Sequence, residues 1–461
     1  MLIEENLAQF RKELQTVNNW WLTSKVKNIE NFPIKRKHFT NIIDEINSSR
    51  IIIITGPRRV GKSVLINQTI DNLIKNNTNP KNILYYSLDD PILYTYSDNV
   101  LKDILDYFLE NISDENKQKY IFLDEIHNFK EWYKWIKAYY DKRKDIKFVI
   151  SGSSSLSIQK ESNKYLRGRT VEIDMYTLSF EEFLTFYKVE YENLNLNKLF
   201  KLKNIELEQI KHKLGKYFKE YLIVGGFPEW FEIKNEKNPV LKWFNRLIDD
   251  IPKKAIYEDV ATMFDIRNPK ILEQIFTFIC ANQSKILSYE TINDIVKLDR
   301  FTLVNYIEFL KSSYLIVEIL KYANIKEQLK SKKKYLTIDQ GLRNAVLKDY
   351  EIKEENEGFI IENLVGIYLW QECQKRNKNL FYWRINGEVD FIIRDKGLSE
   401  VEVKYRNNIK QNDLKNVYNL IQNNIIDVSF IVTKNLLKKE TIGRHNIYFI
   451  PAVLYLITSI E

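Results

Sequence analysis

Ile51-Ile-Ile-Ile-Thr55 runs directly into Gly56-Pro-Arg-Arg-Val-Gly-Lys62-Ser63, so an apolar strand, a loop and a helix start follow one another without a gap. The loop matches the pattern G-x-x-x-x-G-K-[S/T], whose glycines let backbone N–H groups turn inward toward phosphates. Lys62 would reach the β and γ phosphates, Ser63 would bind magnesium, and the helix would add the positive end of its dipole. The stretch predicts a phosphate loop that binds ATP; the alternative is a simple turn.

Composition indicates a globular protein of several domains. A chain of 461 residues exceeds what one hydrophobic core usually supports, which predicts roughly two to four domains. No apolar run is long enough to span a bilayer, and the N-terminus lacks the pattern of an export signal. We therefore expect a cytoplasmic protein without a membrane partner. Cys280 and Cys373 lie far apart, which argues against a disulfide framework or a paired-cysteine zinc site.

Short apolar strands alternate with helical stretches in the first third of the chain, at 51–55, 83–88, 120–123 and 148–151. This alternation predicts an α/β fold with a parallel sheet, and the continuous apolar character indicates strands buried on both faces. Later segments are mostly helical, then α/β again. The predicted domains are an N-terminal helical segment (1–49), a P-loop ATPase core (50–175), a helical lid (176–267), a winged helix (268–350) and a C-terminal α/β domain (351–461).

The strand at 120–123 carries an acidic pair, Asp124 and Glu125, to the carboxyl end of the sheet. Asp124 is expected to hold Mg²⁺ through water, and Glu125 to polarise the attacking water as general base. Ser153, at the end of the next strand, could sense the γ phosphate; the alternative is an ordinary turn residue. His127 is interpreted as a packing or hydrogen-bonded residue.

Two arginines flank a glycine in Leu166-Arg167-Gly168-Arg169. Either guanidinium could stabilise charge on the transferring phosphoryl group, in cis or across a subunit boundary; the alternative is a surface arginine that holds a carboxylate. The residues expected to contact the nucleotide are Gly56, Pro57, Arg58, Arg59, Val60, Gly61, Lys62, Ser63 and Asp124.

Three amphipathic stretches and two strands between about residues 268 and 348 predict a winged helix-turn-helix. The third helix would expose polar side chains for phosphates or base edges, and a lysine cluster would lie in or near the wing. A net charge of +8 favours polyanions but is modest for this length, and clustered lysines are often only solvated. The lysine cluster consists of Lys330, Lys332, Lys333 and Lys334. The candidate DNA contacts are Arg300, Thr302, Asn305, Lys332, Lys333 and Lys334.

Near the C-terminus, Asp390 is followed by a turn at 395–397 and by Glu402 and Lys404. The spacing is typical of the D…E-x-K pattern of metal nucleases, because alternate residues of a strand share a face. Asp390, Glu402 and Glu362 could hold Mg²⁺ while Lys404 positions or helps deprotonate water. The alternative is a solvated charged strand, since Glu-x-Lys also occurs at 232–234 and 351–353.

These motifs together resemble the archaeal and bacterial AAA+-related ATPases whose C-terminal half carries a winged helix and a restriction-endonuclease-like domain. The likeness rests on Gly-Pro-Arg-Arg-Val-Gly-Lys-Ser, Leu-Asp-Glu-Ile-His, Ile-Ser-Gly-Ser-Ser-Ser, Leu-Arg-Gly-Arg and Gly-Gly-Phe-Pro-Glu, in that order. It implies Mg²⁺-dependent ATP hydrolysis by residues 56–63, Asp124 and Glu125. It also implies a sensor role for Ser153 and a finger role for Arg169, which hints at self-association.

The sequence therefore predicts an ATPase that acts on or near DNA, with possible C-terminal nuclease activity. The competing hypothesis is a signalling switch or toxin-like effector, in which the same ATPase controls binding of a protein partner.

Overall fold

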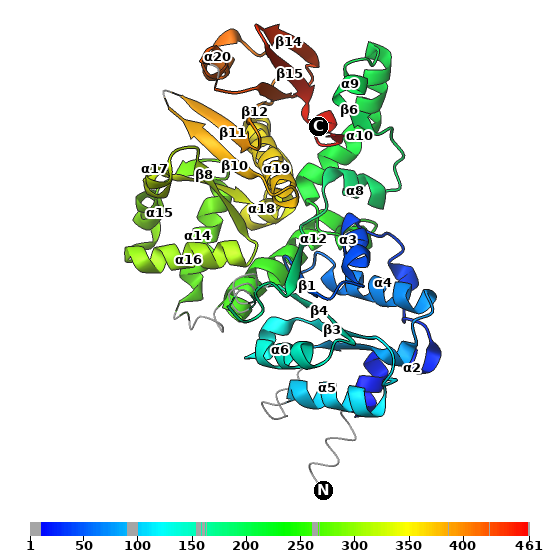
Figure 1. Cartoon of the computed structure of the whole chain (residues 1–461). Helices are drawn as coiled ribbons and strands as arrows, with labels where there is room; N and C mark the ends of the chain where they lie inside the picture. Colours follow the sequence, from blue (N-terminus) through cyan, green and yellow to red (C-terminus); the bar gives the residue numbers. More distant parts are fainter. Residues whose placement is uncertain are drawn as a thin grey trace. The chain divides into compact units, whose positions relative to one another are not determined.

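The computed structural model divides the chain into two compact units, which meet at Tyr176 and Thr177. Figure 1 shows the helices and strands of both units. The structure describes residues 11–89, 100–153, 158, 162, 164–260, 266, 268–385, 387–423 and 425–459. The start of the predicted N-terminal segment and residues 261–265 and 267 of the predicted lid lie outside these ranges.

The first unit is built on a five-stranded parallel sheet in the order β2-β3-β4-β1-β5. Every residue of the central strands β1, β3 and β4 is buried, as the continuous apolar pattern predicted. Four of the strands are confirmed within two residues at each end, and the fifth, β5, was not predicted as a strand. The strands are β1 (Ile51–Thr55), β2 (Ile83–Ser87), β3 (Lys119–Asp124), β4 (Ile146–Gly152) and β5 (Thr170–Asp174).

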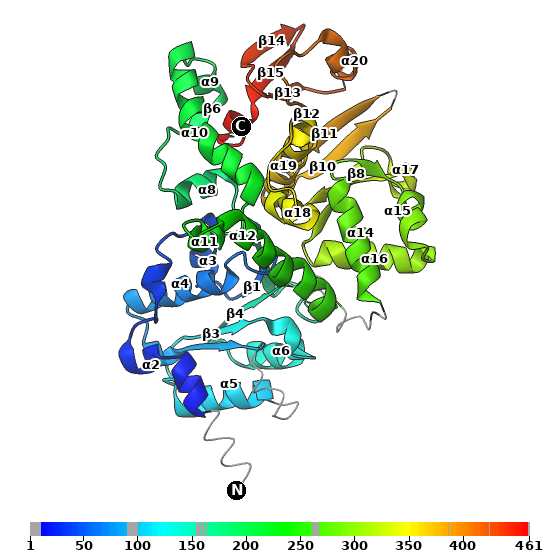
Figure 2. The same ribbon diagram turned by 180° about the vertical axis from the view of Figure 1, so that it is seen from behind.

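Helices cover both faces of this sheet. Both views place α3 and α4 on one face and α5 and α6 on the other (Figure 1 and Figure 2). The indole N–H groups of Trp20 and Trp21 both donate to the carbonyl of Ile83, at 3.1 and 2.7 Å, and so tie the N-terminal segment to the start of β2. The described helices of the unit are α2 (Trp20–Thr23), α3 (Lys37–Glu45), α4 (Lys62–Lys75), α5 (Val100–Asn111) and α6 (Trp132–Lys142).

The second unit begins with helices and continues into a nine-stranded sheet. The first helices of this unit match the predicted helical character after residue 177. They are α8 (Phe180–Phe186), α9 (Leu196–Leu199), α10 (Asn204–Val224), α11 (Trp230–Ile233), α12 (Pro239–Ile248) and the helical segment η5 (Asp249–Val260).

The large sheet has the order β14-β15-β13-β12-β11-β10-β8-β9-β7. It crosses the predicted boundary at residues 350 and 351, because β8 pairs in parallel with β10. The turn predicted at 395–397 joins β11 and β12, which pair antiparallel. The strands are β7 (Ile286–Leu287), β8 (Ile316–Lys321), β9 (Lys333–Thr337), β10 (Asn379–Arg384), β11 (Glu388–Arg394), β12 (Leu398–Lys404), β13 (Val428–Thr433), β14 (Lys438–Ile442) and β15 (His445–Pro451).

Three of the helices around this sheet, α14, α15 and α16, match the three predicted amphipathic stretches. A short helix, α17, lies between β8 and β9. The long helix α19 packs against β9, β10, β11 and β12. The helices are α14 (Pro269–Ala281), α15 (Tyr289–Val296), α16 (Arg300–Ser312), α17 (Ile325–Lys330), α18 (Gln340–Leu347), α19 (Glu354–Lys375), α20 (Lys415–Gln422) and α21 (Ala452–Tyr455). Among all described helices, none is both long and apolar enough to cross a membrane.

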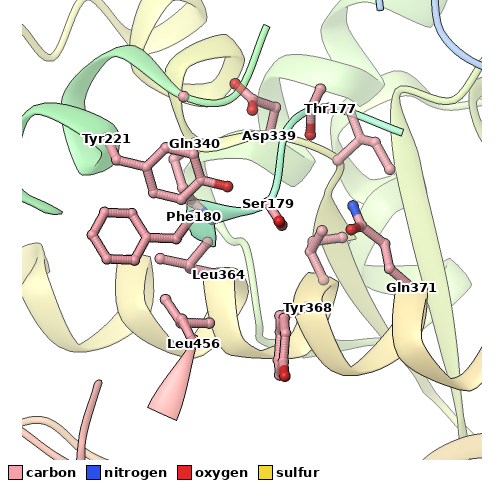
Figure 3. Close-up of a pocket in the computed structure, with 13 residues that line it drawn as sticks. Thr177, Ser179, Phe180, Tyr221, Asp339, Gln340, Leu364, Tyr368, Gln371 and Leu456 are labelled. Carbon is pink, nitrogen blue, oxygen red and sulfur yellow. The ribbon is translucent and has the colours of Figure 1, made fainter. Parts of the chain in front are cut away.

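Asp339, the N-cap of α18, joins this helix to the end of α10. Its carboxylate accepts the backbone N–H groups of Gly226 at 2.7 Å and Leu342 at 3.1 Å. Burial raises the pKa of Asp339 to about 6, although these hydrogen bonds oppose the shift. Next to it lies a cavity of about 20 Å³. Its lining residues include Gln340, Tyr221 and Tyr368 (Figure 3). That volume suits a single water molecule rather than a ligand.

Candidate functional site: a phosphate loop with an acidic strand end

The phosphate loop folds tightly around the ammonium group of Lys62. Gly56 has φ +147°, and a Cβ atom there would lie 2.0 Å from the carbonyl oxygen of Met175, so only glycine fits. Lys62 is 4% exposed, and its Nζ donates to the carbonyls of Gly56 and Pro57 at 3.0 Å each. Gly61 is the N-cap of α4, whose first turn therefore opens at the loop. A loop at a helix N-terminus is a common place for an anion to bind.

Arg36 braces this loop from outside the motif, and the sequence analysis did not single it out. Its side chain is buried, and Nη1 donates to the carbonyl of Val60 at 3.0 Å and to that of Tyr176 at 2.8 Å. No local pattern marks such a residue, because its partners lie 24 and 140 positions away in the chain.

Ser63 and Asp124 meet at the centre of the site. The hydroxyl of Ser63 donates to Oδ2 of Asp124 at 2.5 Å, which joins the start of α4 to the end of β3. Asp124 is 1% exposed and also accepts hydrogen bonds from the hydroxyl of Ser151 and, at 3.2 Å, from that of Tyr85. Burial and the charge of Asp124 raise the pKa of Tyr85, so its phenol stays a hydrogen-bond donor.

The donor set of this site fits a hydrated Mg²⁺ ion. A hydroxyl and a carboxylate oxygen lie side by side, beside a loop shaped for phosphate, and Mg²⁺ in nucleotide sites is typically held by one or two protein oxygens together with water and phosphate oxygens. Ser63 and Asp124 are the residues that would hold it.

Glu125 lies next to Asp124 in the left-handed backbone conformation, with φ +49°. Its Oε2 is 3.3 Å from Nδ1 of His127, and the other ring nitrogen of His127 is 3.3 Å from the hydroxyl of Ser153. The imidazole thus stands between the predicted general base and the predicted sensor. His127 was interpreted as a packing or hydrogen-bonded residue, which agrees with this placement, but its link to both site residues was not foreseen.

The arginines of the predicted site lie at the surface. Nε of Arg169 is 3.2 Å from Oδ1 of Asp141 on α6, which is the surface ion pair named as the alternative to a finger role. Such an exposed pair contributes at most about 1 kcal/mol, so it would not hold the guanidinium against a better partner. Arg59 is exposed and Arg58 partly buried in the phosphate loop.

The structure brings together the acidic residues near the C-terminus, but with a lysine among them. Asp390 accepts the N–H of Val403 at 2.8 Å, Glu402 accepts the N–H of Asp390 at 3.0 Å, and Lys404 donates to Glu402. Lys334 on β9 reaches the same place and lies 2.6 Å from Glu362.

Burial and neighbouring charges shift the pKa values of Glu362, Glu402 and Lys334 in this cluster. Burial raises the pKa of Glu362 to about 8 and that of Glu402 to about 7, and in each case the charge of Asp390 adds to the shift. Burial alone would lower the pKa of Lys334, but Glu362, Asp390 and Glu388 outweigh it and raise that pKa.

The predicted metal-binding residues lie beside a lysine. The ammonium of Lys334 is 2.6 Å from Glu362 and 3.5 Å from Asp390. Within the described ranges, no group of three or more His, Cys, Asp or Glu side chains is placed to hold a metal ion. Binding of Mg²⁺ by Glu362, Asp390 and Glu402 stays a prediction.

Two of the lysines predicted in or near the wing are buried. Lys333 and Lys334 are the first residues of β9 and are 6% and 0% exposed, so neither presents its side chain to a nucleic acid. Their burial follows from the pairing of β9 with both β7 and β8. Lys330 and Lys332 are exposed.

The predicted DNA contacts on α16 differ in how exposed they are. Arg300 at its start is exposed, while Thr302 and Asn305 are partly buried. Thr302 is also engaged with the N-cap Asp299, through both its N–H at 3.0 Å and its hydroxyl at 2.6 Å. Of the three residues, Arg300 is the one most available to a partner.

Comparison with known proteins gives the affiliation of the chain. It is 32% identical over 371 residues to the uncharacterized protein MJ1544 of Methanocaldococcus jannaschii, a match that covers 78% of this chain and 76% of that protein. The chain belongs to the MJ1544 family. Other relatives are the uncharacterized protein MJ1637 of the same organism, 24% identical with 76% and 74% covered, and an uncharacterized protein of Haemophilus influenzae, 26% identical with 78% and 83% covered.

Family models assign parts of this MJ1544-family chain. An AAA domain matches residues 48–184, so the phosphate loop belongs to an AAA-related P-loop domain, as the motifs implied. Domains of unknown function, DUF8612 and DUF4143, match residues 215–351 and 357–455.

Two solved structures align only weakly with this MJ1544-family chain. They are AMPPCP-bound DnaA from Aquifex aeolicus, with TM-score 0.26, and RIF2 from Saccharomyces cerevisiae, with TM-score 0.28; each is 14% identical. They cover 61% and 56% of this chain and 90% and 92% of their own. Scores this low support no further conclusion.

Proposed function

We propose that the first unit binds ATP with Mg²⁺ and hydrolyses it. The observation that carries the proposal is the 2.5 Å contact between Ser63 and Asp124, directly beside the loop that holds Lys62. In this mechanism main-chain N–H groups and Lys62 bind the phosphates. Ser63 and Asp124 would hold Mg²⁺, which would supply neutralising positive charge when bound. Glu125 polarises the attacking water, and Ser153 contacts the γ phosphate.

The test is steady-state ATP turnover of the full chain with Mg²⁺. Lys62→Ala is expected to abolish nucleotide binding, and Glu125→Gln to keep binding while turnover falls about 10²- to 10⁴-fold. Lys75→Ala is the matched control, because Lys75 ends the same helix and pairs with Asp71 on its surface. Full turnover by Lys62→Ala would refute the mechanism.

We further propose that Arg169 can leave Asp141 and reach the nucleotide of a neighbouring copy. The exposed ion pair supports this, because it is weak enough to be exchanged. In that case turnover per chain rises with protein concentration in the wild type, and Arg169→Ala removes the rise.

For the second unit, the first candidate is a winged-helix module that contacts DNA and couples it to ATP turnover. Support comes from the helices α14 to α16 followed by antiparallel strands, the exposed Arg300 and Lys332, and the net charge of +8. DNA would then raise turnover, and binding would weaken steeply with salt.

The second candidate is a switch that binds a protein. Ile325 and Leu329 lie four positions apart on one face of α17 and are 77% and 72% exposed, and Phe301 is 77% exposed. Exposed apolar side chains of this kind fit a protein partner better than a phosphate backbone. If duplex and single-stranded DNA leave turnover unchanged at low salt, this candidate takes precedence.

A further inference from the structure

A buried ammonium group lies inside the acidic cluster of the second unit. Lys334 comes from β9, and its side chain is fully buried. Its Nζ is 2.6 Å from Oε1 of Glu362, 3.5 Å from Oδ1 of Asp390 and 3.7 Å from Oε1 of Glu388. The three carboxylates converge on it from α19 and β11, both of which follow β9 in the chain.

The lysine is held in this position by its surroundings. Nζ also donates to the backbone carbonyl of Asp390 at 3.3 Å and lies 4.8 Å from the centroid of the Phe391 ring. A strand with neighbours on both sides fixes the backbone of Lys334, and the 0% exposure leaves the side chain no path to water without local opening. The ammonium is therefore a permanent part of the cluster.

A divalent ion would compete with this group for the same oxygens. Mg²⁺ binds carboxylate oxygens at about 2.0–2.1 Å and demands near-octahedral geometry with several waters. An ion that used Glu362 and Asp390 would stand within a few ångströms of the ammonium, where like charges in a buried site repel strongly. Lys404, which is paired with Glu402, adds a second positive charge at the edge of the cluster.

We propose that Lys334 is a built-in cation that takes the place of a metal ion, so that the D…E-x-K cluster of this chain holds the sheet and α19 together instead of cleaving phosphodiester bonds. The inference is independent of ATP hydrolysis in the first unit. It accounts for the lack of a metal-type arrangement of acidic side chains in the part of the chain that the structure describes.

The first experiment measures Mn²⁺ binding by calorimetry and by electron paramagnetic resonance. It uses the full chain without nucleotide, carrying Asp124→Asn to remove the metal ligand of the ATP site. With Lys334 intact, no bound Mn²⁺ is expected at Mn²⁺ concentrations up to millimolar. Introducing Asp390→Asn into the same chain should leave Mn²⁺ binding unchanged. One Mn²⁺ per chain that disappears with Asp390→Asn would overturn the proposal.

The second experiment removes the built-in cation. Lys334→Ala in the same background is expected to gain one Mn²⁺ site and to unfold at higher temperature when Mn²⁺ is added. Lys330→Ala is the matched control, because this lysine is exposed at the end of α17 and should gain no site. A folded Lys334→Ala protein without a new site would refute the idea that the lysine fills a cation position.

Cleavage provides a third readout that does not depend on any lysine variant folding. Plasmid incubated with Mg²⁺ and the wild-type chain should stay intact, as it should with Asp390→Asn. Nicking by the wild type that is abolished by Asp390→Asn would show an active metal nuclease and overturn the proposal.

Discussion

Gly225→Ala should unfold the second unit, because the end of α10 leaves no room for a side chain. Gly225 has φ +77° and ψ −162°, a combination that residues with a Cβ atom essentially never adopt. A Cβ atom built there would lie 1.9 Å from Oδ1 of Asp339 and 2.7 Å from the backbone nitrogen of Gly341. The carboxylate that joins α10 to α18 would have to move.

The cost can be worked out from these contacts. The backbone conformation costs about 1–3 kcal/mol in a non-glycine residue. Moving Asp339 breaks its hydrogen bonds to the N–H groups of Gly226 and Leu342, each a bond to a charged group and so about 1.5–3 kcal/mol. The sum, roughly 4–9 kcal/mol, is comparable to the whole stability of a typical domain, about 5–15 kcal/mol.

The assay is urea unfolding followed by far-ultraviolet circular dichroism, with limited proteolysis to tell the two units apart. Gly215→Ala is the control: it lies within α10, nothing lies within 4 Å of its added Cβ, and alanine should stabilise the helix by about 0.5–1 kcal/mol. Equal unfolding midpoints for the two variants would refute the reasoning.

Two further predictions concern buried groups. His127→Ala should lower kcat for ATP about tenfold or more with little change in KM, because Glu125 loses its neighbour at 3.3 Å; an unchanged kcat would remove His127 from the site. Glu400→Gln should stabilise the chain at alkaline pH. Burial and the charge of Glu402 raise the pKa of Glu400 from 4.5 to about 8. The protonated Glu400 side chain therefore contributes its full stabilisation of the folded state below pH 4.5, and this stabilisation is lost as pH rises toward 8. Thermal unfolding should show the variant above the wild type at pH 8.5 and equal to it at pH 4.5; the opposite order would contradict the assignment.

The ATP site could be predicted from sequence because its residues follow one another along two short stretches. Residues 51–63 contain the strand, loop and helix start, and Asp124 ends a strand whose apolar run is unmistakable. The fifth strand, Thr170–Asp174, was missed because only Ile173 among its residues is buried. It therefore lacks the continuous apolar pattern that revealed the other strands.

Lys334 shows why the second unit was harder to predict. In the sequence it belongs to a run of lysines, and such runs are usually solvated. Its partners, Glu362 and Asp390, lie 28 and 56 positions later, and only the pairing of strands brings them to it. Local patterns show which charges are present, but not which of them are paired inside the fold.

The parallel pairing of β8 with β10 has a practical consequence for dissecting the protein. A fragment that ends at residue 350 would keep β8 but lose its neighbour, and one that starts at residue 351 would leave β10 without β8. Each fragment would expose a strand edge with unpaired main-chain donors and acceptors, which promotes pairing with strands of other molecules. Cutting the gene there is therefore expected to give insoluble fragments, whereas point substitutions would leave β8 paired with β10.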